Sequence, residues 1–343
     1  MNVAVVGLGW WGKMMVDSLA PSVSVRVVAA VEPNQEVGEP LCRRWGIRLH
    51  RELGEALADT AVDAVILTTP NRFHEAQVIE SAQRGKHVFC EKPLALSLAS
   101  AERAVAACVH HGVRLGIGHE RRFEPPTAMV QRMISEGSLG RVLQIEGNFS
   151  QNKFLALPAD NWRLAVAEAG CGPMTATGIH LLDLAGSIAG PALEVRAVAS
   201  NRATGFASGD SAAAHVLFAD GVTASINAML ATPFHARFAV FGDRGWIEIR
   251  DKSHVERPSG WTVTRSDSDG DITVLDVPPA TPVRDNVEAF ARAVAGRQSD
   301  YPIPLQQMLD TTALLEAVSD ATRSGGIVVP VRSGLLAASG VSA

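Results

Sequence analysis

Residues 3–12 read Val-Ala-Val-Val-Gly-Leu-Gly-Trp-Trp-Gly and lead into a helical pattern. The four apolar residues have the length of a buried strand. Gly7 permits a tight turn after that strand, Gly9 lets a ligand approach the main chain, and Gly12 lets the helix lie close to the strand. The free N–H groups at the helix start, at the positive end of the helix dipole, suit a pyrophosphate. The stretch therefore predicts a dinucleotide-binding site, to which we also assign Trp10 and Trp11.

Glu32 lies 20 residues after Gly12 (32 − 12 = 20), at the end of a second apolar run, Val25–Val31. This is about the spacing at which dinucleotide folds place the acidic residue that binds the ribose. Because a carboxylate repels a 2′-phosphate and residues 33–35 supply no arginine to compensate, the sequence predicts NAD rather than NADP. A Gly-x-Gly-x-x-Gly pattern by itself is weak evidence, and a turn that binds no ligand is the alternative interpretation.

Composition narrows the class of protein. The length of 343 residues is typical of two domains, and 47% hydrophobic residues suffice for a large core. A net charge of −5 shows no basic field, so no nucleic-acid partner is expected. No apolar stretch reaches the roughly 18 residues of a membrane span, and no signal peptide is expected. The four cysteines lack zinc or redox spacing, so we expect a cytoplasmic protein with reduced thiols and no metal site.

Up to about Gly118 the chain alternates short apolar runs with helical patterns. This alternation predicts a doubly wound parallel α/β sheet, a Rossmann fold, over residues 1–120, with ligands at the carboxyl ends of the strands. The expected strands are Val3–Val6, Val25–Val31, Ala64–Leu67, His87–Cys90 and Val113–Ile117. The expected helices lie near Lys13–Leu19, Glu36–Trp45, Phe73–Arg84 and Leu98–His110.

Longer strands dominate the chain after about Arg141. They predict an α+β domain over residues 121–343, with a large, mostly antiparallel open sheet. The expected strands are Val142–Ser150, Leu193–Asn201, Ser211–Phe218, Val222–Leu230 and Arg237–Ile249. Hairpin turns are expected at Ala219–Gly221 and Gly242–Gly245, an exposed loop tip at Asp267–Asp271, and helices at Asn286–Ala295 and Leu305–Arg323.

Two motifs follow strands of the predicted parallel sheet. Thr68-Thr69-Pro70-Asn71, with His74 one turn later, is either a strand end with an asparagine helix cap or a segment that lines the cofactor, and both can hold together. Glu91-Lys92-Pro93 ends the strand His87–Cys90. A lysine directly after a buried run is unusual unless it points into a polar cleft, and burial lowers a lysine pKa in the direction that suits proton transfer.

A third motif lies in the second predicted domain. Asn161-Trp-Arg163 precedes a glycine-rich stretch that runs into Gly178-Ile-His180-Leu-Leu-Asp183. His180 and Asp183 are three residues apart and therefore share one helix face. A single histidine on an apolar helix is more often a packed core residue than a catalytic one.

Taken together, these motifs resemble the Gfo/Idh/MocA family, the relatives of glucose–fructose oxidoreductase and inositol dehydrogenase. The resemblance covers essentially the whole chain, and Glu91-Lys92-Pro93 in its strand context is its most specific part. The other marks are the glycine stretch, Thr68–Asn71 with His74, Gly118-His-Glu-Arg-Arg-Phe with Pro125, Trp162-Arg163, and Gly178-x-His180-x-x-Asp183.

The resemblance implies a Rossmann domain, a C-terminal domain whose open sheet forms homodimer or homotetramer contacts, and hydride transfer between NAD(P) and a secondary hydroxyl of a sugar, cyclitol or ring diol. It implies that Lys92 binds the reacting oxygen and shuttles its proton, and that His180 is the general base or acid. The resemblance also implies that Arg163 and Asp183 lie near a small-molecule substrate, with packing or a salt bridge as the alternative role of each. We add Arg122 and Thr177 as candidate substrate contacts, the latter for its hydroxyl.

Three positions depart from the family pattern. Ala176 stands where many relatives have an aspartate four residues before the histidine, Cys171 stands where many have glycine, and the only tyrosine is Tyr301. A reactive thiol at Cys171 is disfavoured because no cationic residue adjoins it in the sequence. A Tyr-x-x-x-Lys dehydrogenase site is excluded, because Leu305 occupies the lysine position.

Two further hypotheses about the function remain besides that of a dehydrogenase. The missing aspartate is compatible with transient oxidation that assists another net reaction, such as glycosidic bond cleavage with NAD recycled. It is also compatible with a cofactor-binding sensor without turnover. Arg121, Arg122 and Arg163 raise the separate hypothesis of an anionic substrate.

Overall fold

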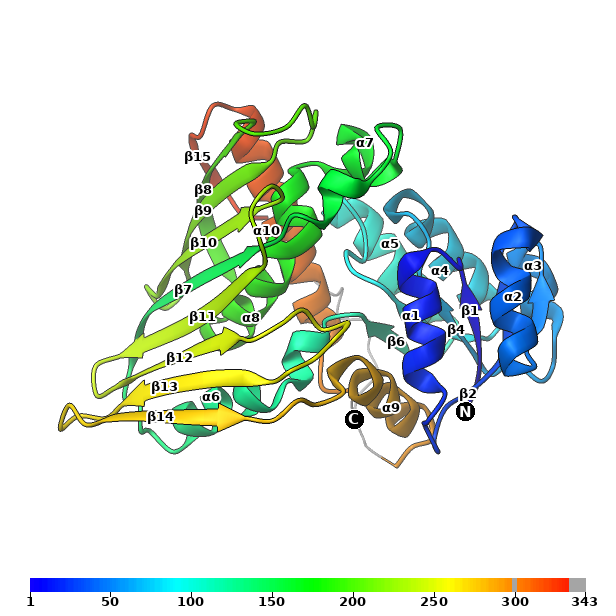
Figure 1. Cartoon of the computed structure of the whole chain (residues 1–343), viewed down its shortest axis with the longest axis horizontal. Helices are drawn as coiled ribbons and strands as arrows, with labels where there is room; N and C mark the ends of the chain where they lie inside the picture. The colour runs from blue at the N-terminus through cyan, green and yellow to red at the C-terminus, as the bar shows by residue number, and fades with distance from the viewer. Residues whose placement is uncertain (298–300, 333–343) are drawn as a thin grey trace. The chain divides into compact units, whose positions relative to one another are not determined.

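The computed structural model describes residues 1–297 and 301–332, which form two compact units (Figure 1). The first unit holds Met1–Glu120 together with the described part of Thr281–Met308. The second holds Arg121–Ala280 together with the described residues from Leu309 onward. The described part of Thr281–Met308 thus groups with the first unit, whereas the sequence predicts that all residues after 120 form one second domain.

The first unit contains a six-stranded parallel sheet in the order β3-β2-β1-β4-β5-β6. The strand order reverses between β1 and β4, which makes their carboxyl ends the point where ligands bind in such folds. The strands are β1 Asn2–Val6, β2 Arg26–Val31, β3 Arg48–His50, β4 Ala64–Leu67, β5 His87–Cys90 and β6 Leu115–Ile117. The helices are α1 Trp10–Leu19, α2 Gln35–Trp45, α3 Leu53–Ala58, α4 His74–Gln83, α5 Leu98–His110 and α9 Pro282–Val294.

The predicted doubly wound sheet is therefore confirmed. β1 and β4 are buried along nearly their whole length, which explains why both read as continuous apolar runs. Local signals also set helix boundaries: the Asn34 side chain caps α2 by accepting from the Glu36 N–H, and α2 ends at Gly46 with φ +63°. The strand β3 and helix α3 were not predicted, because each is short and β3 has only three residues, none fully buried.

Helix α9 joins the first unit through aromatic and polar contacts. The ring of Phe290 lies 5.7 Å from that of Phe89 on β5. The Asn286 side-chain amide donates a 2.9 Å hydrogen bond to the Ile117 carbonyl at the end of β6, and the Tyr301 hydroxyl donates to the same oxygen over 3.1 Å. These contacts explain why a segment late in the chain groups with the parallel sheet.

The second unit contains a nine-stranded sheet in the order β14-β13-β12-β11-β7-β10-β9-β8-β15, antiparallel except where β7 meets β10. The strands are β7 Val142–Ser150, β8 Ala192–Ser200, β9 Ser211–Phe218, β10 Thr223–Met229, β11 His235–Gly242, β12 Trp246–Asp251, β13 Trp261–Ser266, β14 Ile272–Val277 and β15 Val328–Pro330. The remaining helices are α6 Pro125–Ser135, α7 Val166–Ala169, α8 Ile179–Ala189 and α10 Leu305–Arg323, of which the residues from Leu309 onward belong to this unit.

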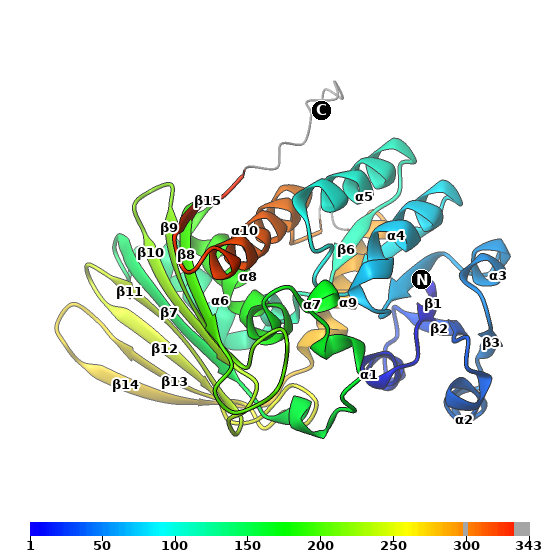
Figure 2. The same ribbon diagram turned by 90° about the horizontal axis from the view of Figure 1, so that it is seen from above.

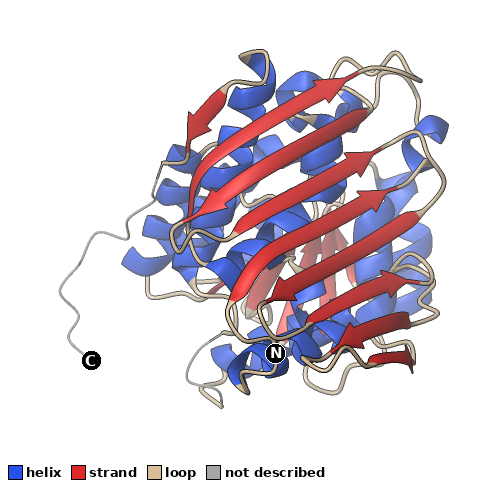
Figure 3. Ribbon diagram, turned by 90° about the vertical axis from the view of Figure 1, so that its left-hand side faces the viewer, coloured by secondary structure: helices blue, strands red, loops and turns tan. Residues whose placement is uncertain are grey.

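One face of this sheet is covered by α6, α8 and α10, whose apolar side chains join the sheet's core (Figure 2). The opposite face carries no described helix of this unit (Figure 3). The burial of β9 alternates accordingly, from Ala212 to Phe218. The predicted open, mostly antiparallel sheet is confirmed, but its two edge strands, β14 and β15, and β13 beside β14 were not predicted.

Candidate active site

The glycine turn after β1 is built as the sequence motif requires. Gly7 has φ +89°, and its N–H donates to the Val31 carbonyl over 2.8 Å. A Cβ atom on Gly12 would lie 1.9 Å from the Gly7 carbonyl oxygen, so α1 can approach β1 only with glycine there. A Cβ atom on Gly9 would meet no atom within 4 Å, which leaves open space beside the main chain where a ligand can approach. Trp10, at the start of α1, is 44% exposed beside this turn.

The Glu32 carboxylate bonds to the glycine turn. Its Oε2 accepts a 2.9 Å hydrogen bond from the Leu8 N–H, and its Oε1 accepts one of 3.1 Å from the Asn34 N–H. The carboxylate is thereby held at the end of β2 and next to the open side of the turn. This is the arrangement that dinucleotide folds use to bind ribose hydroxyls.

The Thr68–Asn71 segment packs onto the same turn. The Thr68 hydroxyl lies 2.6 Å from the Gly7 carbonyl oxygen, to which it donates, and the Thr69 hydroxyl donates to the Gln77 side chain over 2.6 Å. Pro70 precedes a 3₁₀ turn over Asn71–Phe73. The helix-cap interpretation of Asn71 is wrong, because α4 begins only at His74 and has no side-chain cap.

The Glu91-Lys92 pair follows β5 at the carboxyl edge of the sheet. Glu91 is 6% exposed, and its Oε2 accepts from the Lys92 N–H over 3.2 Å, while Lys92 is half-buried. A Cβ atom on Gly118 would lie 2.5 Å from the Glu91 carboxylate, so that glycine makes room for it. Burial, together with the nearby Glu120 carboxylate, raises the pKa of Glu91 to about 8, against the opposing effects of Trp11 and Lys92.

Sequence reasoning did not identify Glu120 as part of this cluster. It is 5% exposed and follows β6, the neighbour of β5, so both carboxyl groups reach the same sheet edge. The available signal was that two acidic residues closely follow adjacent strands.

We expect Glu91→Gln to remove a component of the pH dependence of stability. The unfolded carboxyl ionises near pH 4.5 and the folded one near 8, so the folded state holds the extra proton between these values. The free energy of unfolding of the wild type therefore falls as pH rises through this window, by at most about 5 kcal/mol at 1.4 kcal/mol per unit. Urea titrations between pH 5 and 8 should give a shallower slope for the variant.

The matched control is Glu75→Gln. Its hydrogen bond with Arg103 lowers the pKa of Glu75, so this group is ionised in both states above pH 5 and should leave the slope unchanged. An identical slope in the wild type and Glu91→Gln would show that Glu91 is ionised in the folded protein.

In the second unit, His180 is the second residue of α8 and is 5% exposed. Its ring lies 5.8 Å from that of Phe149, over which the Arg121 guanidinium stacks at 4.5 Å. Phe149 was not singled out from the sequence, because an apolar residue inside a strand has no distinguishing pattern. The histidine is thus held against an aromatic ring at the start of a helix.

Arg122 and Asp183 form a bidentate ion pair. The Arg122 Nε and Nη2 atoms lie 2.6 and 2.8 Å from the two carboxylate oxygens, and Thr311 contributes a 3.3 Å contact to the same group. The two charged side chains are only 7% and 1% exposed. Arg121 pairs likewise with Asp251 over 2.8 Å, so both arginine charges are balanced inside the second unit.

We expect Arg122→Ala to destabilise the protein by about 3–5 kcal/mol, because it leaves a buried carboxylate uncompensated. Arg43→Ala is the control: it breaks an exposed pair with Glu39 and should cost less than about 1 kcal/mol. Urea unfolding at pH 7 measures both values. Equal midpoints for the two variants would contradict the structural role of the buried pair.

The other two residues predicted to contact the substrate, Thr177 and Arg163, make contacts within the second unit. The Thr177 hydroxyl donates to the Phe149 carbonyl over 2.7 Å and is almost fully buried. Arg163 stacks on Trp162 at 4.2 Å, and burial lowers its pKa to about 10. Roles of these two residues toward a substrate stay predictions, as do those of Arg122 and Asp183.

Two of the departures from the family pattern have structural explanations. Ala176 packs against the small apolar cluster of Phe154, Leu164 and Leu230, so this position is adapted to a nonpolar side chain. Burial raises the pKa of Cys171 to about 11, which keeps its thiol protonated and argues against a reactive role.

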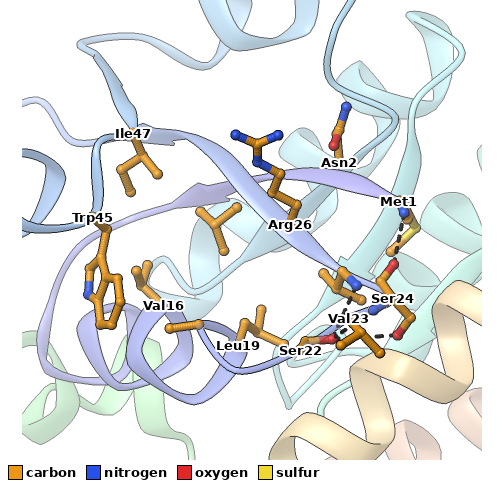
Figure 4. A pocket seen from close by; sticks show the side chains of 13 residues that line it. Met1, Asn2, Val16, Leu19, Ser22, Val23, Ser24, Arg26, Trp45 and Ile47 are labelled. Atoms are coloured by element: carbon orange, nitrogen blue, oxygen red, sulfur yellow. Dashed lines mark hydrogen bonds between the residues drawn. The ribbon is translucent and has the colours of Figure 1, made fainter.

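A separate hollow of about 450 Å³ lies at the amino-terminal edge of the parallel sheet (Figure 4). It is lined by the starts of β1 and β2, with Asn2 and Arg26, and by Trp45 and Ile47. This edge is opposite to the glycine turn, because parallel strands end on the other side of the sheet.

A doubly wound parallel sheet with a glycine turn after its first strand is the architecture of dinucleotide-binding Rossmann domains. Residues 1–119 match the model of the oxidoreductase family with an NAD-binding Rossmann fold, and residues 127–248 match the Gfo/Idh/MocA C-terminal domain. The chain belongs to the Gfo/Idh/MocA family of oxidoreductases.

Several of its curated relatives are named for reactions of sugars or sugar derivatives. The chain is 30% identical over 277 residues to 1,5-anhydro-D-fructose reductase of Ensifer adhaerens, a match that covers 79% of this chain and 81% of the relative. It is 33% identical to 2,7-anhydro-N-acetylneuraminate hydratase of Mediterraneibacter gnavus (42% and 38% covered) and 30% identical to levoglucosan dehydrogenase of Pseudarthrobacter phenanthrenivorans (58% and 54%). The last two matches span less than two thirds of the relatives' length.

Solved structures share the fold across nearly the whole chain. Aldose-aldose oxidoreductase from Caulobacter crescentus superposes with a TM-score of 0.86 at 24% identity, covering 96% of this chain and 99% of the other. A levoglucosan dehydrogenase in complex with NADH gives a TM-score of 0.84 at 22% identity, covering 97% and 99%. Within residues 1–297 and 301–332, no helix combines the length and apolar composition that crossing a bilayer requires.

Proposed function

We propose that the chain is an NAD-dependent oxidoreductase that transfers a hydride between nicotinamide and a secondary hydroxyl of a sugar, cyclitol or ring diol. The observation that carries the proposal is the placement of Lys92, after β5, on the same carboxyl edge of the sheet as the glycine turn. Relatives named as dehydrogenases and reductases of sugars and scyllo-inositol support the substrate class.

The described residues fit NAD. The open side of Gly9 admits a pyrophosphate, and Glu32 offers a carboxylate to the ribose. We further assign Trp10, Trp11, Thr68–Asn71, His74 and Glu91 to the surroundings of the cofactor. Bound NAD supplies the hydride acceptor or donor.

Two residues handle the proton of the reacting hydroxyl in this proposal. The Lys92 side chain binds the reacting oxygen and shuttles its proton, and the His180 imidazole is the general base or acid that accepts or returns it. A screen of polyols and sugars with NAD at alkaline pH tests the activity, with NADH absorbance as the readout. Absence of turnover with every substrate, despite NAD binding, would favour the sensor reading instead.

We expect NAD to bind more tightly than NADP. The Glu32 carboxylate accepts hydrogen bonds from ribose hydroxyls and repels a 2′-phosphate. Calorimetric titration with both cofactors gives the two dissociation constants, and a tighter constant for NADP would refute the assignment. Glu32→Gln removes the repulsion and should narrow the difference between the two constants.

A second candidate is a net non-redox reaction in which NAD is recycled. The relative from Mediterraneibacter gnavus carries the name of a hydratase, and Ala176 replaces the aspartate that the family resemblance leads us to expect. Purified protein loaded with NAD distinguishes the two: a dehydrogenase accumulates NADH stoichiometrically with product, whereas the recycling enzyme converts many substrates per NAD without net NADH.

We also propose that the protein acts in the cytoplasm as a homodimer or homotetramer assembled through the open face of the nine-stranded sheet. Alternate residues of β9 and β10, such as His215 and Asn227, are exposed on that face. Light scattering after size-exclusion chromatography gives the oligomeric mass. Arginine or glutamate substitutions at these two positions should lower that mass.

A further inference from the structure

His74 lies between the ends of two neighbouring strands of the parallel sheet. It is the first residue of α4 and is 1% exposed. Its Nδ1 lies 2.7 Å from the Pro93 carbonyl oxygen, and its Nε2 lies 3.0 Å from the Thr69 carbonyl oxygen. Thr69 follows β4 by two residues and Pro93 directly follows Lys92, so the imidazole connects the β4 end to the segment that carries the lysine.

Both partners of the ring are main-chain carbonyl oxygens, which can only accept hydrogen bonds. A neutral imidazole has one N–H and one lone pair, so one of the two contacts would bring lone pairs together. An imidazolium donates from both nitrogens and satisfies both contacts. Turning the ring over would put carbon atoms at these positions and lose both hydrogen bonds.

We propose that His74 is doubly protonated at neutral pH and is a positioning residue. Its two hydrogen bonds fix the main chain at Thr69 and Pro93, and thereby the neighbouring Lys92, at the edge of the sheet proposed to bind the nicotinamide. The positioning role rests on the proposed function, whereas the protonation state does not. Two charge-assisted hydrogen bonds, each roughly twice as strong as a neutral one, offset the cost of burying the cation.

The charged groups on the elements around His74 come from three places. Glu91 and Lys92 lie at the end of β5, Arg72 lies in the turn that precedes α4, and Glu75 on α4 pairs with Arg103 on α5. The opposite charges of Glu75 and Arg103 neutralise each other. Because Glu91 stays protonated up to about pH 8, it contributes no negative charge at neutral pH, and Glu91→Gln should leave the protonation state of His74 at pH 7 unchanged.

Histidine-selective ¹⁵N NMR of the full chain without cofactor tests the protonation state. The His74 resonances are identified by their loss in His74→Gln. We expect both His74 nitrogens to keep the chemical shifts of protonated imidazolium nitrogens at pH 8, where free histidine in the same buffer has lost a proton. A single protonated nitrogen at pH 8 would overturn the proposal.

The positioning role is tested by measuring kcat and the dissociation constant of NAD separately in the same variant. His74→Gln can donate to one carbonyl but not to both, so the Lys92 segment should shift and kcat should fall about tenfold or more. The dissociation constant of NAD should change by less than about threefold, because the ring is only 1% exposed and borders the cofactor site through the main chain of Thr69 and Pro93, whereas the glycine turn and Glu32 are the groups proposed to bind NAD directly. An equal loss of NAD affinity and kcat would show a general structural role instead.

The control is His87→Gln, at the amino-terminal start of the same strand. The His87 Nδ1 accepts from the Arg114 N–H over 3.0 Å and lies at the opposite edge of the sheet from Lys92. This variant should leave kcat within about twofold of the wild type. If no substrate is found, the NMR result still decides the protonation state, so failure of the proposed function and failure of this inference are distinguishable.

Discussion

Lys92→Ala is expected to lower turnover by at least about a hundredfold while NAD still binds, because the variant loses the group that we propose binds the reacting oxygen and shuttles its proton. The lysine is half-buried after β5, and its loss leaves the glycine turn and Glu32 untouched. Steady-state kinetics on the substrate found in the polyol screen, together with NAD titration by calorimetry, measure the two effects separately.

The matched control is Lys86→Ala, a second lysine of the first unit. The Lys86 ammonium donates to the Asp59 and Val62 carbonyls over 2.9 and 2.7 Å at the amino-terminal side of β5. Its removal should lower stability but leave kcat of the folded protein unchanged. Turnover retained in Lys92→Ala would exclude this lysine as the proton carrier.

Gly12→Ala is expected to destabilise the first unit and abolish NAD binding together. The added Cβ would stand 1.9 Å from the Gly7 carbonyl oxygen and 2.8 Å from the Thr68 hydroxyl, so the start of α1 must move away from β1. Overpacking of this kind costs roughly 1–3 kcal/mol or more. Thermal unfolding with and without NAD should show a lower midpoint and no shift on adding the cofactor.

Gly9→Ala separates the ligand effect from the fold. Gly9 has φ −63°, which any residue adopts, and its Cβ would meet no atom of the protein within 4 Å. The unfolding midpoint without NAD should therefore match the wild type, while NAD affinity falls because the methyl group occupies the path of the pyrophosphate. Unchanged NAD affinity in Gly9→Ala would mean that the cofactor does not approach this turn.

The features that the chain shares with its family could be predicted because each is encoded by a few neighbouring residues. The strand, the turn and the helix over residues 2–19 follow from apolar length and three glycines, and the structure adds only their exact boundaries. The motif Glu91-Lys92-Pro93 and the carboxylate at Glu32 could be placed for the same reason, since each directly follows a buried strand.

Pairings between distant residues could not be predicted in this way. Arg122 and Asp183 were each assigned to the substrate, yet they bind one another across 61 positions of sequence. Of the three unpredicted strands of the second unit, β14 and β15 form the two edges of its sheet and have no fully buried residue, so their apolar periodicity is weak. β13 lies beside β14 and does bury Trp261 and Val263.

The sequence by itself determined the parallel sheet, its glycine turn and which candidate site residues follow the ends of strands, because backbone geometry and strand ends are encoded within a few neighbouring residues. The tertiary structure alone decided which charges meet, such as Glu91 with Glu120, and that α9 completes the first unit. It also decided that both nitrogens of His74 face carbonyl oxygens. These facts depend on distance and burial, which the order of residues does not specify.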